Sequence, residues 1–175
     1  VLDLDDLSEK VDASGARFLL ISHMRGHLVD MDKLMKIVNE KNLILIEDCA
    51  HTMGAQWGKQ RSGNFGIAGC FSTQTYKHLN SGEGGLLTSN DEEFMARAII
   101  YSGSYMLYER HGASPKAEVF ANIRLETPNY SGRMDNLRAS ILRPQLGNLD
   151  TNIERWNKRY KIVESMLSQV KGVEV

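Results

Sequence analysis

The sequence predicts an α/β fold in which helices cover a mostly parallel central sheet. Two short apolar runs, at residues 16–24 and 43–46, each have the length of a buried strand. Residues 30–42, between these runs, have the spacing of an amphipathic helix. A strand, a helix and a strand within about thirty residues form a βαβ unit, and such a unit implies a parallel sheet covered by helices.

The helix of this unit has clear boundaries. Asp30 is suited to cap its first turn, and Asn42 ends it. Its apolar face has the i, i+3, i+4, i+7 spacing and consists of Met31, Leu34, Met35 and Val38. The second strand leads into Glu47 and Asp48, which we expect just after it. That carboxyl end is where ligands bind in open α/β sheets.

The middle of the chain predicts a loop, two more strands and a helix. Residues 51–66 are loop-like, with four glycines, and residues 68–73 fit a third strand. The segment around Lys77 and the glycine-rich residues 82–85 come next, followed by a strand at residues 86–88. A helix is expected from Asp91, with Asn90 and Glu93 as a capping box. Residues 102–130 have no clear period, which predicts a long, partly helical excursion.

The C-terminal part predicts helices. Residues from Arg133 onward read as helix, interrupted near Pro144. Apolar residues then recur at alternate spacings of four and three, which fits a coiled-coil seam or, as we favour, one long amphipathic helix: Leu149, Ile153, Trp156, Tyr160, Val163, Leu167 and Val170. We therefore divide the chain into residues 1–148, part of a large domain, and 149–175, a helix leading toward a further domain. The first residue is not Met and the last residues resemble a strand start, so we expect an incomplete large domain.

The composition is that of a globular protein. Of the 175 residues, 42% are hydrophobic and 25% are charged, and the net charge of -1 predicts neither a nucleic-acid nor a membrane partner. The N-terminal residues lack the pattern of a signal peptide. Cys49 and Cys70 lie in segments that read as buried, which favours reduced core thiols and a cytoplasmic protein.

Lys77 and Asp48 are the candidate chemical groups. Lys77 lies between a hydroxyl-rich segment and a glycine-rich one, where partial desolvation would favour its neutral amine. Such an amine forms an imine with a carbonyl cofactor. Asp48, at a strand end, could hold a proton on a pyridine nitrogen. Taken alone, Lys77 could instead be structural, and Asp48 a helix cap or a Mg²⁺ ligand.

Two further residues complete the candidate site. Ser72 could donate to a phosphate oxygen, and His51 could face a cofactor ring or be structural. His23 and His27 straddle Gly26 without a third ligand at a suitable spacing, so no metal site is predicted. The glycine run matches neither a dinucleotide-binding motif nor a P-loop.

These residues together resemble a known family. Four ordered motifs look like the central block of the DegT/DnrJ/EryC1/StrS aminotransferases: EDCAHTMGA at 47–55, GNFG at 63–66, FSTQTYK at 71–77 and GEGG at 82–85. Residues 23–31 and 129–137 are similar to its flanking signatures, so the likeness covers roughly residues 17–149. It implies the three-layer α/β/α large domain of fold-type-I enzymes that use pyridoxal 5'-phosphate (PLP).

The resemblance also implies roles and partners. Lys77 would form the Schiff base and shuttle a proton, Asp48 would pair with the pyridinium nitrogen, His51 would lie near the ring, and Ser72 would bind the phosphate. The reaction implied moves an amino group from an amino acid, Glu or Gln, to a keto-sugar, a nucleotide-linked keto-sugar or a cyclic keto-polyol. Fold-type-I enzymes also imply a homodimer.

Other functions remain open. Some members of the family are dehydratases in which histidine replaces the lysine, whereas here Lys77 is present with His78 beside it. A non-catalytic PLP-binding sensor would use the same pocket. The chain also departs from the family pattern, because Ser131 stands where an asparagine is usual and Asn129 lies two residues earlier.

Overall fold

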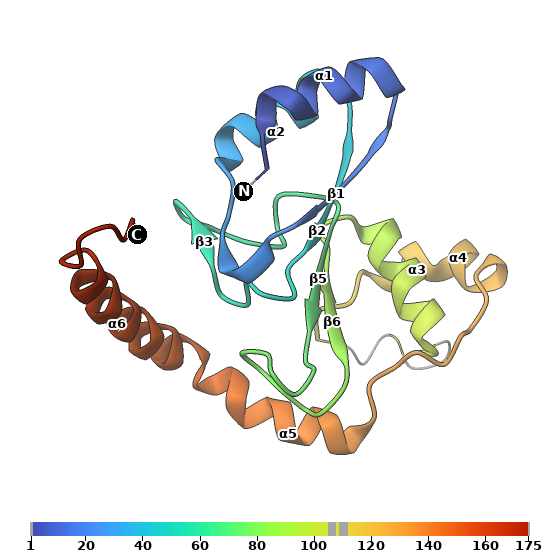
Figure 1. Ribbon diagram of the computed structural model, residues 1–175. Helices are drawn as coiled ribbons and strands as arrows, with labels where there is room; N and C mark the ends of the chain where they lie inside the picture. The colour runs from blue at the N-terminus through green and yellow to red at the C-terminus, as the bar shows by residue number, and fades with distance from the viewer. Residues whose placement is uncertain (1, 105–107, 109–111, 175) are drawn as a thin grey trace.

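The central feature of the computed structural model is a four-stranded sheet, shown in Figure 1. The structure describes residues 2–104, 108 and 112–174. The strands lie in the order β1-β2-β5-β6, namely β1 Phe18–Ser22, β2 Ile44–Asp48, β5 Ala68–Ser72 and β6 Gly85–Thr88. β1, β2 and β5 are parallel, while β6 runs antiparallel to β5. The prediction of an α/β fold with a mostly parallel sheet is therefore confirmed.

Two helices cover one face of this sheet. The predicted helix is α2, Met31–Glu40, and the Asp30 side chain caps it by accepting from the amide of Lys33 at 3.0 Å. Asn42, with φ 52°, turns the chain into β2. α1, Leu4–Ser14, was not predicted, and Asp3 caps it. The helices and strands share one apolar core, which contains Leu7, Val11, Ile21, Val29, Met31, Leu34, Val38, Leu43 and Leu45.

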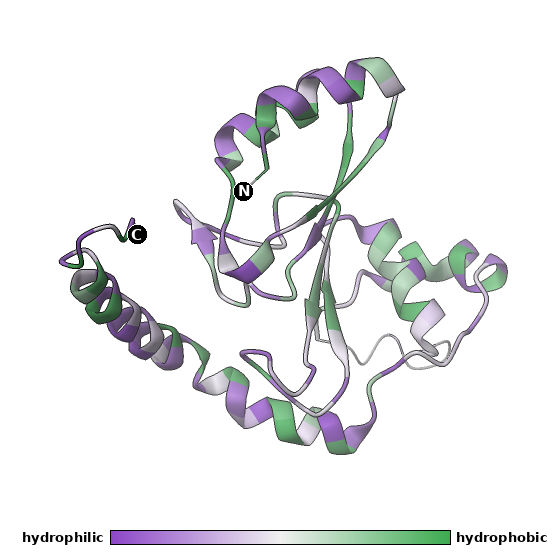
Figure 2. Ribbon diagram, viewed as in Figure 1, coloured by the Kyte–Doolittle hydropathy of each residue, from purple (hydrophilic) through white to green (hydrophobic). Residues whose placement is uncertain are grey.

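The two faces of the sheet differ in exposure. Side chains alternate along a strand, so Ile21 and Leu45 point into the core beneath α1 and α2. Phe18 and Leu20 point the opposite way and are each 66% exposed. Figure 2 shows that β1 and β2 are nevertheless apolar over most of their length, and polar residues follow only at their carboxyl ends. Among the described residues, no helix layer covers Phe18 and Leu20.

Cys70 lies on this second face as well, because it pairs in register with Asp48, which pairs with Ser22. Cys49 is buried as expected, but Cys70 is exposed, so the prediction of two core thiols was wrong for Cys70. Both cysteines are free, in agreement with the expected absence of a disulfide between them.

The loop and helix boundaries differ in detail from the predictions. The loop at 51–66 contains a small hairpin of β3, Gln56–Trp57, and β4, Gln60–Arg61. α3, Glu92–Ser102, begins one residue later than the capping box of Asn90 and Glu93 predicted. Asp91 caps it through the amide of Phe94 at 2.7 Å, and Glu93 instead binds Arg97 at 2.7 Å.

The excursion at 102–130 is partly helical, as predicted. It contains a 3₁₀ turn, Ala117–Val119, and α4, Phe120–Glu126. Residues 105–107 and 109–111 lie outside the described part. α3 and α4 pack together beside β6, as Figure 1 shows, around a second apolar cluster of Ala96, Ile100, Tyr108, Phe120 and Ile123.

Two helices form the C-terminal part and curve away from the sheet in Figure 1. α5, Asn136–Gly147, begins after Asp135, not at Arg133, because the Asp135 side chain accepts from the amide of Arg138. Pro144 lies inside α5, and the break falls at Asn148. There an amide-to-carbonyl bond to Gln145 tightens the last turn and ends the helix.

α6, Leu149–Leu167, starts at the predicted residue but stops before residue 175. Its apolar side is buried only at the start: Leu149 is 7% exposed, whereas Tyr160 and Val163 are more than half exposed. The division of the chain at residue 148 remains a prediction. Within the described residues, no helix has the length and apolar content needed to cross a membrane.

Candidate functional site

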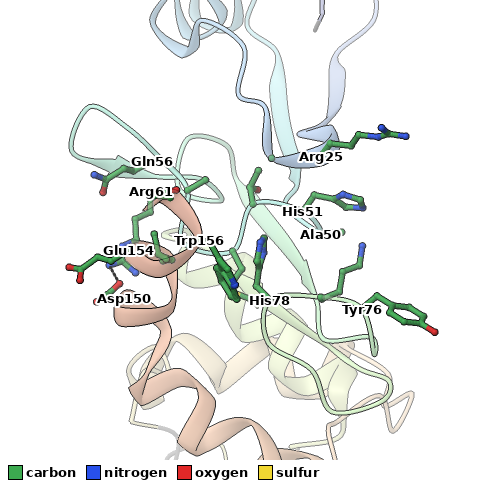
Figure 3. Close-up of a pocket in the computed structure, with 18 of the residues that line it drawn as sticks. Arg25, Ala50, His51, Gln56, Arg61, Tyr76, His78, Asp150, Glu154 and Trp156 are labelled. Atoms are coloured by element: carbon green, nitrogen blue, oxygen red, sulfur yellow. Dashed lines mark hydrogen bonds and ion pairs between the residues drawn. The ribbon is translucent and has the colours of Figure 1, made fainter. Parts of the chain in front are cut away.

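A cavity of about 850 Å³ lies where the turn after β2, the loop after β5 and the start of α6 meet. Its lining includes His51 from the turn after β2, Lys77 and His78 from the loop after β5, and Trp156 from α6. Figure 3 shows His51 above this loop, with His78 beside Trp156. The structure thus brings two of the four predicted site residues, His51 and Lys77, to one cavity.

The loop that carries Lys77 is held by the glycine-rich segment after it. The amide of Thr73 donates to the carbonyl of Gly84 at 2.9 Å, and that of Thr75 to Gly82 at 3.0 Å. Gly84 has φ +137°, and a Cβ there would lie 2.7 Å from the Thr73 hydroxyl. Glycine suits this position because L side chains rarely adopt this φ and because the Thr73 hydroxyl is fully buried and has little room to move aside.

Helices α5 and α6 fix the cavity from the other side. Gln145 makes two hydrogen bonds to the backbone of Asn80, at 3.0 and 2.7 Å, and so ties α5 to the Lys77 loop. The rings of His78 and Trp156 lie 4.8 Å apart. Arg61 of the hairpin pairs with Asp150 of α6 at 2.9 Å. The cavity wall therefore depends on contacts between segments far apart in sequence.

Asp48 is the last residue of β2, not the residue after it as predicted, because the parallel pairing with β1 and β5 extends to this position. Its Oδ2 accepts from the Ser22 hydroxyl at 2.8 Å, and its Oδ1 from the Ala50 amide at 3.0 Å. Burial alone would raise the pKa of Asp48. The two hydrogen bonds, together with the positive charges of His51 and Lys77, outweigh burial and lower it.

Ser72 and Asp48 do not line the cavity themselves. Ser72 is the last residue of β5, and its Oγ accepts from the amide of Gln74 at 3.3 Å. It lies two residues beyond Cys70, the register partner of Asp48, so by strand alternation it is on the same sheet face. The turn that Asp48 begins does line the cavity, from Ala50 onward, so Asp48 stands two residues before the cavity wall.

Glu47 and His23 form a buried pair that the sequence analysis missed. Both side chains are 0% exposed, and Nε2 of His23 donates to Oε2 of Glu47 at 3.0 Å. Glu47 also accepts from the amides of Gly63, Phe65 and Gly66 at 2.9, 2.7 and 2.9 Å. An acid at a core-facing position of an apolar strand was the signal for this pair. Glu47 thereby fixes the loop at 63–66 behind the site.

His23, Glu47 and Cys49 also bring their ligand-type atoms within 4.8 Å of one another. Four hydrogen bonds already occupy the oxygens of Glu47. Burial raises the pKa of Cys49 to about 11, which keeps its thiol protonated. These features favour a structural role for the group over metal binding.

Other lining residues were also missed. Arg25 lines the cavity from the 3₁₀ turn Met24–Gly26 after β1, and Trp156 lines it from α6. Arg25 lies within the flanking signature at residues 23–31 but was assigned no role, and Trp156 was expected only as part of the apolar side of a helix. Asn129, in the segment that departs from the family pattern, is used locally: its Oδ1 accepts from the amide of Ser131 at 2.7 Å, and Ser131 has φ 52°. Sequence spacing alone gives no signal for such contacts.

The comparison with family models decides the relationship. The model of the DegT/DnrJ/EryC1/StrS aminotransferase family matches residues 1–175. The chain belongs to this family. The resemblance inferred from four motifs is therefore confirmed. The match to the family model also extends beyond residues 17–149, the range that the motifs suggested.

Individual relatives can be compared with the chain as well. GDP-perosamine synthase from Escherichia coli O157:H7 is 27% identical over 154 residues, which are 88% of this chain and 39% of that protein. The structure of AtS13 from Actinomadura melliaura matches with a TM-score of 0.80 and 29% identity, over 99% of this chain and 46% of the other. The chain therefore spans less than half the length of each of these two proteins.

A dehydratase is also similar. E. coli GDP-4-keto-6-deoxy-D-mannose-3-dehydratase with bound hydrated PLP matches with a TM-score of 0.68 and 25% identity, over 91% of this chain and 43% of the other. These solved structures confirm the expected fold-type-I architecture. Membership of the family alone does not separate amino transfer from dehydration, so the residues at the site must be weighed.

Proposed function

We propose that the complete protein is a PLP-dependent aminotransferase and that this chain supplies much of its cofactor site. The amino group would come from an amino acid, Glu or Gln, and pass to a keto-sugar, a nucleotide-linked keto-sugar or a cyclic keto-polyol. Relatives with names of this kind support the substrate class, among them GDP-perosamine synthase and, from Streptomyces kanamyceticus, L-glutamine:2-deoxy-scyllo-inosose aminotransferase.

The observation that carries the proposal is that an amine and a carboxylate stand at the carboxyl ends of two neighbouring parallel strands, β5 and β2. Lys77, in the loop after β5, lines the cavity, and so does the turn that Asp48 begins at the end of β2, from Ala50 onward. When bound, PLP supplies an aldehyde that bonds to an amine and a pyridine ring that withdraws electrons. An ionised Asp48 suits the protonated ring nitrogen, because it places a negative charge beside a positive one.

The remaining residues fit the same cofactor. Ser72 uses its oxygen as an acceptor for Gln74, which leaves its hydroxyl hydrogen available to a phosphate oxygen. His51 lines the cavity from the turn after β2, three residues after Asp48, and is suited to lie against the cofactor ring. Lys77, once its amine is free, can hold and deliver a proton within the cavity. The expected homodimer stays a prediction, because the structure contains one chain.

Dehydration is the second candidate. His78 lines the same cavity as Lys77, and burial lowers the pKa of His78, helped by the charges of His51 and Lys77. A neutral imidazole can accept a proton, which a dehydratase needs. We favour amino transfer because Lys77 is present at the motif position that the dehydratases of the family fill with histidine.

Borohydride trapping tests the proposal. The full-length protein is incubated with PLP, reduced with borohydride and digested, and the modified peptide is identified by mass spectrometry. We expect PLP on Lys77 in the wild type and in the control Lys59→Ala, whose residue lies in the exposed hairpin turn, and none in Lys77→Ala. Trapping that survives in Lys77→Ala would refute the assignment of Lys77.

Substrates then separate the candidate functions. Prior addition of glutamate or glutamine should reduce trapping severalfold and convert the cofactor to its amine form if the protein is a transaminase. A sensor would keep the trapped lysine unchanged. A dehydratase would release ammonia and a dehydrated sugar, with no amino sugar formed.

A further inference from the structure

Ser22 is a polar residue at the end of an otherwise apolar strand face. β1 places Phe18, Leu20 and Ser22 on the same side by strand alternation. The pattern of this face would favour a third apolar side chain at position 22. The Ser22 hydroxyl instead donates to Oδ2 of Asp48, on the neighbouring strand β2, at 2.8 Å.

The strand pairing makes this contact reproducible. Ser22 and Asp48 are register partners at the carboxyl ends of two parallel strands. The two backbones are held together there, since the amide of His23 donates to the carbonyl of Asp48 at 3.1 Å. The register therefore keeps the two side chains side by side, and the Ser22 rotamer present in the structure directs the hydroxyl at the carboxylate.

The two oxygens of Asp48 are bound by different parts of the protein. Oδ1 accepts from the amide of Ala50, which lies in the turn that Asp48 begins. Oδ2 accepts from Ser22 across the sheet. One bond alone would leave the carboxylate free to rotate about its bond to Cβ. Both bonds together fix the plane of the carboxylate, and each oxygen keeps a lone pair for another donor.

We propose that Ser22 is a positioning residue that fixes the orientation and the charge of Asp48 for its contact with the cofactor ring nitrogen. This inference rests on the proposed function, in which Asp48 meets that nitrogen. The ligand of the Ser22–Asp48 unit is accordingly the pyridinium nitrogen of PLP, and Ser22 itself acts only through Asp48.

The physical effect of the hydroxyl has a definite sign. A neutral donor to a carboxylate favours the ionised form, and the Ser22 bond is one of the causes that lower the pKa of Asp48. Other groups act on the same carboxylate or respond to it. The titratable neighbours with which its charge interacts are His51 and Lys77, which are positive when protonated, and the thiols Cys49 and Cys70.

Ser22→Val and Ser22→Thr form a matched pair for the test. Valine and threonine have nearly the same size and both suit a β-strand, but only threonine has a hydroxyl. The first measurement is the titration of the Asp48 carboxyl carbon by ¹³C NMR in the full-length protein without PLP, assigned with Asp48→Asn. We expect a higher pKa in Ser22→Val than in the wild type, and a value close to that of the wild type in Ser22→Thr.

The second measurement is amino transfer by the protein with PLP across pH. Ser22→Val should lower kcat about tenfold with little change in the KM of the amino donor, because hydrogen bonds to charged groups are among the stronger ones. The acid limb of its pH profile should move to higher pH, and Ser22→Thr should restore both. A merely structural serine would change stability without moving this limb.

Several results would overturn the inference. An unchanged Asp48 titration in Ser22→Val would show that the hydroxyl does not act on the carboxylate. Equal kinetic effects in Ser22→Val and Ser22→Thr would show that size, not the hydroxyl, matters. Failure of the proposed function is recognised separately, since the wild type would then trap no PLP on Lys77, and the inference would fall with it.

Discussion

Replacing Glu47 with glutamine removes the charge from a fully buried side chain that accepts four hydrogen bonds. Glutamine keeps one oxygen and turns the other into an amide nitrogen, which cannot accept. If the remaining oxygen serves Phe65 and Gly66, the amide of Gly63 faces that nitrogen, whereas His23 can carry its proton on the unpartnered Nδ1 and accept from the new amide through Nε2. One buried donor without an acceptor costs roughly 1–3 kcal/mol of the free energy of unfolding.

The loss should depend on pH. Burial raises the pKa of Glu47, but its hydrogen bonds with His23 and the three amides outweigh burial and lower it below the ordinary value of 4.5. The ionised carboxylate therefore contributes stability above the unfolded pKa, and this contribution is lost as pH falls through the folded pKa. The difference between the wild type and Glu47→Gln should be full at pH 7 and should shrink below about pH 4.5.

Urea unfolding of the full-length protein, followed by circular dichroism at several pH values, measures this difference. Glu40→Gln is the control, because the Glu40 side chain is exposed on α2 and its ion pair with Lys36, at 3.8 Å, is exposed as well. It should change stability by less than about 0.5 kcal/mol. The reasoning is refuted if Glu47→Gln unfolds at the wild-type urea concentration at pH 7, or if its deficit stays constant through the acid range.

Two further predictions concern packing and thiol reactivity. In Gly54→Ala the new Cβ would lie 2.3 Å from Cδ1 of Ile153, at a residue with φ +84°, so we expect the free energy of unfolding to fall by about 1–3 kcal/mol. The double variant with Ile153→Ala should recover part of this loss, and thermal unfolding of the single variant at the wild-type temperature would contradict the packing of α6 against Gly54. Iodoacetamide at pH 8 should label the exposed Cys70 well before Cys49, because burial raises the pKa of Cys49 to about 11. Peptide mass spectrometry of samples taken over time measures the order of labelling, and earlier labelling of Cys49 would disprove the prediction.

Local patterns in the sequence were sufficient for the βαβ unit. The spacing of Met31, Leu34 and Val38 specified the buried face of α2, and the apolar runs specified β1 and β2, because period and capping depend on neighbouring residues alone. The ordered motifs around Asp48 and Lys77 were enough to recognise the family, since motif spacing is itself a property of the sequence.

Helix ends and exposed positions were harder to predict. The break between α5 and α6 falls at Asn148 and not near Pro144, because a backbone bond to Gln145 ends the helix there. The cap of α3 is Asp91 and not the predicted Asn90, and both residue types are suited to cap a helix, so composition does not distinguish them. The exposure of Cys70 was not predicted, because the burial of a strand residue depends on what covers its face of the sheet. The sequence of the strand alone does not contain this information.

The sequence by itself determined the fold class, the family and the identities of the candidate residues Asp48, His51, Ser72 and Lys77. Only the tertiary structure decided which side chains meet: Ser22 with Asp48 across two strands, His23 with Glu47 in the core, and Trp156 of α6 with His78. The physical reason is that strand register and helix packing are set by the whole fold. Contacts between residues distant in the chain follow from that register and packing, while periodicity reports only on close sequence neighbours.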